Sequence, residues 1–166
     1  MASITKVYKE AQPALRFIGK KYGNSDRVDG CFSAKWDEWF QNGWFDEIEK
    51  LYERNLNEFH PEGGAYIGLI SDTDGDFEYW IGIFMPPGTN SPEGFGHVDF
   101  PAENLGVAWV YGKVHEVFNE VLAWEAVKAK GFETKSTWYF ERCACPRFTE
   151  ADENGNIVLD MCFFLK

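Results

Sequence analysis

The chain has 166 residues, 45% of them hydrophobic, which is enough for one domain whose core needs no disulfide or metal staple. Its formal net charge of −11 would repel a phosphate backbone, and its longest basic cluster is Lys20-Lys21, so direct binding to nucleic acid is not expected. No apolar run approaches the roughly 18 residues of a membrane span, and the N-terminal residues lack the apolar region of a secretory signal. We therefore expect one cytoplasmic domain, residues 1–166, that contacts no membrane and whose four cysteines are free thiols.

The first half of the chain, about residues 10–86, is predicted to form a β-α-β-β unit. A helix is expected from Ser33 to residue 57, with a bend or break at Asn42-Gly43. Asp74-Gly75 is a tight-turn signal between the last two strands of this half, which predicts a hairpin. The expected strands cover residues 14–19, 66–71 and 77–85.

The second half, residues 97–166, repeats this order after a connector rich in proline and glycine at 86–96. A helix is expected to begin near Val114 and to stop at Gly131. Asn154-Gly155 is again a hairpin signal. The expected strands cover residues 106–111, 137–143 and 157–165, and the apolar face of the helix is formed by Val114, Val117, Phe118, Val121 and Leu122.

Two such halves predict an α+β protein, in which duplicated β-α-β-β units form an antiparallel sheet with two main helices on one face. Pseudosymmetric halves leave a crevice at their junction, and small-molecule sites favour such junctions. The sequence therefore predicts a central ligand groove.

Glu141 is the strongest candidate for a site residue, because it interrupts the core-like run Trp138-Tyr-Phe-Glu-Arg142. Strand alternation places Tyr139, Glu141 and Cys143 on one face, with Phe140 on the other. If the first face is covered, Glu141 is buried and is protonated, hydrogen-bonded by tyrosine or ready for a cationic ligand. If it faces solvent, Glu141 pairs with a neighbouring cation, and the pattern leaves both interpretations open.

Aromatic side chains make up 17% of the chain, which suits a large core and an aromatic pocket alike. Helix aromatics are more often core than ligand wall, although the run from Trp36 to Trp44 is denser than packing requires. Trp80 lies opposite Tyr79 on its strand, whereas Trp109 and Tyr111 share a face. The candidate pocket aromatics are Trp36, Trp39, Phe40, Tyr79, Trp80, Trp109, Tyr111 and Tyr139.

No metal site or cofactor is expected. Asp72, Asp74 and Asp76 resemble a calcium loop only superficially, since the glycine is misplaced and the twelfth position is Ile83. Cys143-Ala-Cys145 has no second pair of ligands at a zinc spacing. Phosphate-loop, dinucleotide and Gly-x-Ser-x-Gly motifs are absent from the sequence.

Several short motifs occur in a familiar order: Phe77-x-Tyr79-x-Ile81-Gly82, Phe100-Pro101 leading to Gly106-Val-Ala108, Trp124, and Tyr139-x-Glu141. With these motifs, residues 10–166 resemble the GyrI-like family, which includes effector-binding domains of AraC-type and MerR-type multidrug regulators. The resemblance implies a groove that takes lipophilic, often cationic, molecules between aromatic walls. It places the acidic position on Glu141, with Tyr79 and Trp109 or Tyr111 beside the groove.

The regulators of this family carry a helix-turn-helix, for which this chain has neither the room nor the positive charge, so we expect it to act alone. Stand-alone members suggest three roles: a binding or sequestering module, a hydrolase of strained electrophiles such as cyclopropane-containing alkylating natural products, and a protein-binding inhibitor of gyrase. In the hydrolase, Glu141 would be the general base, or would polarise the ligand with Tyr139. A pKa of Glu141 near neutrality would favour the hydrolase, and an ordinary pKa with tight cation binding would favour the receptor. Whether the chain is an enzyme stays open, as does a homodimer.

Overall fold

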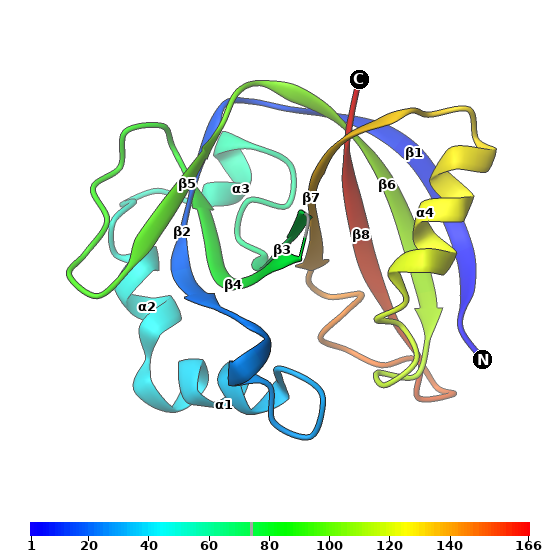
Figure 1. Ribbon diagram of the computed structural model, residues 1–166, viewed down its shortest axis with the longest axis horizontal. Helices are drawn as coiled ribbons and strands as arrows, with labels where there is room; N and C mark the ends of the chain where they lie inside the picture. The colour runs from blue at the N-terminus through cyan, green and yellow to red at the C-terminus, as the bar shows by residue number, and fades with distance from the viewer. Residues whose placement is uncertain (74) are drawn as a thin grey trace.

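The structure is a computed structural model that describes residues 1–73 and 75–166, and only the backbone of Ser136. Within these residues the strands form one eight-stranded antiparallel sheet in the order β1-β6-β8-β7-β3-β4-β2-β5, which confirms the α+β class (Figure 1). The strands are β1 (Ser3–Gln12), β2 (Leu15–Tyr22), β3 (Tyr66–Thr73), β4 (Asp76–Met85), β5 (Gly96–Phe100), β6 (Glu103–Gly112), β7 (Thr134–Cys143) and β8 (Ile157–Leu165). The helices are the 3-10 turn η1 (Asn24–Asp26), α1 (Ser33–Asn42), α2 (Trp44–Glu49), α3 (Leu56–Phe59) and α4 (Glu120–Ala129).

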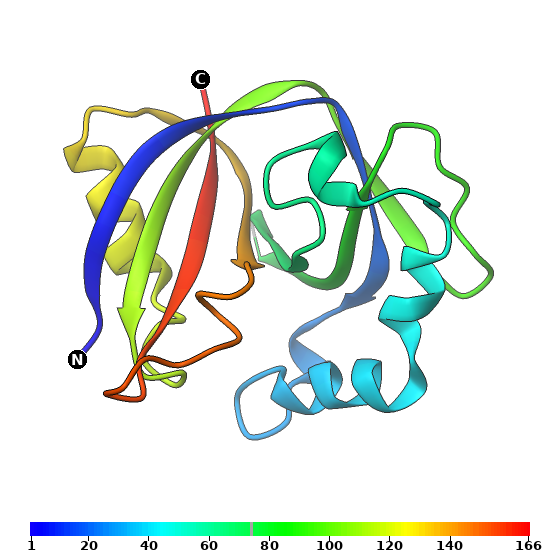
Figure 2. The same cartoon turned by 180° about the vertical axis from the view of Figure 1, so that it is seen from behind.

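The two halves are joined by an exchange of strands. β2, β3 and β4 form one half with α1 to α3, and β6, β7 and β8 form the other with α4. β1 pairs with β6 of the second half and β5 pairs with β2 of the first, so the segments β1–β2 and β5–β6 both arch from one half to the other (Figure 2). β3 pairs with β7 at the centre, with Gly68 opposite Glu141.

The long helix expected from Ser33 breaks where the sequence indicated. Gly43 adopts a left-handed backbone conformation with φ of 65°, which glycine tolerates without strain, and it separates α1 from α2. Beyond Glu49 the expected helix is wrong, because residues 50–55 are irregular and only the short α3 follows. In the described part of the chain no helix has the length and apolar content to cross a membrane.

The second helix begins six residues later than expected, at Glu120 instead of Val114. The side chain of Asn119 accepts a hydrogen bond from the backbone N–H of Leu122 and caps the helix there. The expected apolar face is therefore wrong in part: Ala123 and Val127 are buried, as is Val117 in the preceding turn. Of the other expected residues of that face, Leu122 is half-buried, while Val114, Phe118 and Val121 are exposed.

Two strands were not expected from the sequence. β1 is an edge strand with several exposed polar side chains, including Lys6 and Lys9, so it lacks the apolar alternation of a buried strand. β5 begins at the end of the expected connector and forms the opposite edge. β3 and β4 form the expected hairpin, in which Thr73 pairs with Asp76, and the predicted turn residue Asp74 lies outside the described residues.

The sheet separates three apolar clusters. Its inner face gathers side chains from both halves around residues such as Phe17, Phe84 and Phe164. Its outer face carries one cluster under α1 and α2 and a second under α4. The α1–α2 unit and α4 lie on opposite sides of the central strands β3 and β7 in Figure 1. Within the described part of the chain, no helix packs over the outer face of these two strands.

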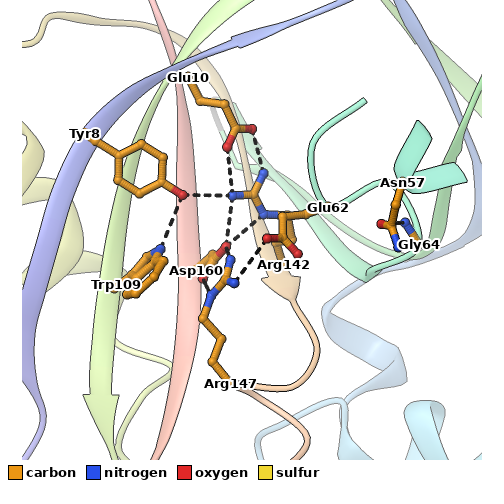
Figure 3. A network of polar contacts seen from close by, with 9 residues as sticks. All are labelled: Tyr8, Glu10, Asn57, Glu62, Gly64, Trp109, Arg142, Arg147 and Asp160. Atoms are coloured by element: carbon orange, nitrogen blue, oxygen red, sulfur yellow. Dashed lines mark hydrogen bonds and ion pairs between the residues drawn. The ribbon is translucent and has the colours of Figure 1, made fainter. Parts of the chain in front are cut away.

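A buried ionic network on the inner face ties the halves together (Figure 3). Asp160 on β8 is fully buried and accepts hydrogen bonds from Arg142 Nε at 2.9 Å and Arg147 Nε at 2.9 Å. Arg142 also binds the carboxylate of Glu10 on β1 at 2.7 Å, and Arg147 binds Glu62 before β3 at 3.1 Å. We term these five residues the ionic clamp.

Candidate ligand-binding site

A cavity of about 550 Å³ lies on the outer face of the sheet, between the start of α1 and the segment that leads into α4. Its floor comes from β3, β4 and β7, so both halves contribute to it, as expected of a groove at their junction. The volume is within the usual range for small-molecule sites. The lining residues are Arg27, Cys31, Phe32, Ser33, Trp36, Ile70, Phe77, Tyr79, Val114, His115, Phe118, Glu120, Tyr139 and Glu141.

Glu141 is the acidic group in the floor of this cavity, with 8% of its surface exposed. The hydroxyl of Tyr79 donates to Glu141 Oε2 at 3.0 Å, and Trp36 Nε1 donates in turn to the Tyr79 oxygen at 2.9 Å. Among the described residues no hydrogen bond reaches the other carboxyl oxygen, Oε1. Burial raises the pKa of Glu141 to about 7 against the opposing effect of the Tyr79 hydrogen bond, and Glu120 raises it further.

The pairing of β3 with β7 makes room for this carboxylate. Gly68 lies opposite Glu141, and a Cβ atom at Gly68 would stand 2.6 Å from both Glu141 Oε2 and the Tyr79 oxygen. A side chain at Gly68 would therefore displace the hydrogen bond between Tyr79 and Glu141. The glycine allows the carboxyl and phenol groups to meet on this face.

One wall of the cavity is a stack of aromatic rings. Phe32 stacks on Tyr79 with 4.2 Å between ring centroids and 1° between planes. The guanidinium of Arg27 lies over the rings of Phe32 and Phe77, at 4.6 and 4.8 Å from their centroids. The wall thus already holds a cation against aromatic faces.

The opposite rim is built by the segment before α4 and the start of that helix. Val114 is 57% exposed and Phe118 is 43% exposed, and Phe118 packs edge-on against Phe148. Glu120, the first residue of α4, supplies a second carboxylate at the rim. Apolar and acidic groups therefore meet at the cavity mouth.

The structure brings four of the expected site residues together: Glu141, Tyr139, Tyr79 and Trp36 all line the cavity. The expected alternation holds, because Tyr139 packs with the outer clusters while Phe140 belongs to the inner one. Tyr139 also stacks on Phe163 of β8. Burial raises the pKa of Tyr139, and the charges of Glu120 and Glu141 raise it further.

The remaining expected residues lie outside this cavity. Trp39 is fully buried in the core beneath α1, where its Nε1 donates to Tyr22. Phe40 on the same helix is 60% exposed and packs beside Phe45 and Tyr66. Trp80 and Trp109 pack in the apolar cluster on the inner face of the sheet, which is the face opposite the cavity. Tyr111 lies toward the end of β6, where its hydroxyl donates to Asp152.

Several lining residues were not expected from the sequence. Phe77 shares the strand face of Tyr79, so alternation supplied the signal that identifies it. Phe32 precedes α1, and Arg27 and Cys31 lie in an irregular loop whose position no periodicity predicts. Across the described residues, no group of three or more His, Cys, Asp or Glu side chains is arranged to hold a metal ion.

Replacing Gly68 by alanine is expected to destabilise the fold by roughly 1–3 kcal/mol, since the new methyl group must displace Tyr79 or Glu141. Urea unfolding followed by tryptophan fluorescence measures this loss. Gly23→Ala is the matched control, because a Cβ at Gly23 meets no atom within 4 Å. Equal stability of the two variants would show that the floor of the cavity tolerates a side chain at Gly68.

No family model matches the sequence, and no curated protein matches it. Solved structures do match over nearly the whole chain. A bacterial transcription regulation protein from Staphylococcus aureus MU50 is 15% identical with a TM-score of 0.64, and the match covers 97% of this chain and 98% of that one. SAV2435 bound to tetraphenylphosphonium is 16% identical with a TM-score of 0.65, covering 98% of this chain and 94% of that one.

Part of a larger protein also matches. EcmrR, solved in a complex with DNA, is 12% identical with a TM-score of 0.61, and the match covers 97% of this chain but 57% of EcmrR. A hydrolase encoded by lin2189 from Listeria innocua is 10% identical with a TM-score of 0.51, over 97% of this chain and 92% of that one. These likenesses establish the fold, which this chain shares with a bacterial transcription regulation protein and with SAV2435, the latter solved with tetraphenylphosphonium bound.

Proposed function

We propose that this chain is a small-molecule-binding domain of the GyrI-like kind, whose cavity takes apolar, cationic aromatic molecules with Glu141 as their counter-ion. The observation that carries the proposal is a carboxylate buried in an aromatic cavity, where the described residues give a hydrogen bond to only one of its two oxygens. An unpaired buried charge is unfavourable, and a bound cation would remove that cost. The match to SAV2435 bound to tetraphenylphosphonium supports the same ligand class.

The aromatic wall suits such a ligand. Aromatic rings of a ligand can stack on Phe32 or Trp36, while its positive charge faces the ring quadrupoles and Glu141. Arg27 already lies over Phe32 and Phe77, so a cationic ligand would replace or rearrange it. Both features favour an aromatic cation over a small hydrophilic one.

Binding of tetraphenylphosphonium is expected to quench tryptophan fluorescence, since Trp36 lines the cavity. Only ionised Glu141 attracts the cation, and its pKa in the free protein is about 7. Affinity should therefore be nearly full at pH 8 and about tenfold lower at pH 6, where most of the carboxyl is protonated. Titrations across this range measure the effect. A dissociation constant that is flat with pH would contradict the role of Glu141 as counter-ion.

Hydrolysis of a strained or activated ligand is the second candidate, and the raised pKa of Glu141 is the observation that favours it. A carboxyl that titrates near neutrality can take a proton from water as the water attacks an electrophilic carbon. Its test is to incubate cyclopropane-containing alkylating compounds with the protein and to weigh the recovered compound. Addition of one water, lost in Glu141→Gln, would identify an enzyme, whereas recovery of intact compound supports the receptor.

We further propose that the protein works in the cytoplasm and makes no direct contact with nucleic acid. The net charge of −11 and the free thiols of all four cysteines support these two points. No feature of the described residues argues for inhibition of gyrase, whose test is whether the protein alone slows supercoiling.

A further inference from the structure

Cys31 is a thiol at the mouth of the cavity. It lies in the loop between η1 and α1, is exposed, and lines the same cavity as Glu141. Cys145 is also exposed but is not part of that lining, while Cys143 and Cys162 are buried. The chain therefore offers two accessible thiols, one inside the proposed ligand site and one outside it.

The surroundings of Cys31 favour its thiolate form. Its Sγ lies 3.4 Å from Ser33 Oγ, and the side-chain and backbone hydrogen bonds of Ser33 lower the pKa of the Cys31 thiol. Arg27 lowers it further, whereas Asp29 and partial burial oppose the change. Cys31 also stands just before the first turn of α1, where the helix dipole favours negative charge. The thiolate is the nucleophilic form of cysteine.

The cavity supplies an independent reason for a reactive compound to stay beside this thiol. Phe32, the next residue, stacks on Tyr79, whose hydroxyl binds Glu141. Glu141 is 8% exposed and keeps Oε1 free of hydrogen bonds among the described residues. A compound with an aromatic ring and a polar group can therefore contact an apolar wall and a hydrogen-bonding carboxyl group in the same cavity that Cys31 lines.

We propose that Cys31 captures apolar α,β-unsaturated carbonyl compounds covalently after they enter the cavity. The Cys31 sulfur forms a bond to the β-carbon, and the electron pair of the carbon–carbon double bond moves to the α-carbon. The α-carbon takes up one proton, which balances the proton that the thiol gives up. No leaving group, oxidant or reductant is needed. This inference rests on the proposed function, because it requires a cavity that accepts aromatic molecules.

The experiment compares two probes on the reduced 166-residue chain. Chalcone is an apolar aromatic enone, and acrylamide is a small polar α,β-unsaturated amide. Peptide mapping by mass spectrometry gives the labelling rates of Cys31 and Cys145 with each probe. Dividing the Cys31-to-Cys145 rate ratio for chalcone by that for acrylamide cancels the intrinsic reactivity of the two thiols, so that the quotient reports binding beside Cys31.

We expect this quotient to be at least about ten, because a bound electrophile reacts at a raised effective concentration. Saturating tetraphenylphosphonium should slow chalcone labelling of Cys31 and leave that of Cys145 unchanged, and Cys145→Ser should still form the Cys31 adduct. A quotient near one overturns the inference, as does full labelling of Cys31 while tetraphenylphosphonium is bound. If tetraphenylphosphonium fails to bind but the quotient stays high, the cation receptor fails and covalent capture stands.

Discussion

Replacing Glu141 by glutamine is expected to weaken tetraphenylphosphonium binding by more than tenfold at pH 8 while making the fold more stable. Charges about 6 Å apart interact by roughly 3 kcal/mol at an effective dielectric constant of 20, and the variant loses this attraction. The glutamine oxygen still accepts the hydrogen bond from Tyr79 that Glu141 accepts in the protein. Fluorescence titration and thermal unfolding of both proteins measure the two effects.

The gain in stability depends on pH in a defined direction. Because the pKa of Glu141 rises from 4.5 to about 7 on folding, the folded state binds protons more tightly and its stability falls as pH rises between these values. The free energy of folding that is lost by ionising Glu141 is thus complete well above pH 7 and nearly absent below pH 4.5. Above pH 7 the Glu141→Gln variant should therefore be more stable by roughly 3 kcal/mol. If Glu141→Gln binds tetraphenylphosphonium as tightly as the unmodified protein does, a group other than Glu141 balances the charge of the cation.

Glu120→Gln is the matched control for this experiment. Glu120 lines the same cavity but is exposed at its rim, so water screens its charge. We expect its removal to change cation affinity by less than about threefold and to leave the melting temperature nearly unchanged. A larger loss of affinity than in Glu141→Gln would show that Glu120 at the rim, and not Glu141 in the floor, is the counter-ion of the bound cation.

Replacing Asp160 by asparagine is expected to cost about 3–5 kcal/mol of folding free energy, because it leaves Arg142 and Arg147 with a neutral partner inside the ionic clamp. Asp160 has no exposed surface, so water cannot replace its charge. Its strand, β8, lies between β6 and β7, so the loss should appear in cooperative unfolding of the whole chain. Urea unfolding at pH 7 measures it.

Asp99→Asn is the control for the clamp. Asp99 also pairs with an arginine, Arg16 at 2.7 Å, but its side chain is 58% exposed, so solvent screens the pair. Its unfolding midpoint should match that of the unmodified protein. If Asp160→Asn also unfolds at the same urea concentration as the unmodified protein, the charge of Asp160 in the ionic clamp does not contribute to stability.

The receptor and hydrolase proposals share one physical basis. A buried carboxyl that titrates near neutrality is half ionised at pH 7, so it can hold a cation or exchange a proton with water. Tyr79 and Trp36 fix its orientation in either role. The chemistry of the compound in the cavity, and not the pocket alone, separates binding from turnover.

Much of the fold followed from local sequence patterns. The hydrophobic runs predicted strands where the structure has β3, β4, β7 and β8, because apolar segments rich in β-forming residues and bounded by turn residues usually form strands. Gly43 and Gly131 ended helices as expected, since both have a positive φ that glycine adopts freely. The edge strands β1 and β5 were not predicted, because only their partners in the sheet define them.

The sequence by itself determined that Glu141 shares a strand face with Tyr139, because side chains alternate with a period of two along a strand. Only the tertiary structure decided which face is covered, that β3 pairs with β7, and that Gly68 leaves room for the carboxyl group and Tyr79. It likewise separated Trp36 in the cavity from Trp80 and Trp109 on the inner face. These outcomes depend on strand order and long-range packing, which no local pattern encodes.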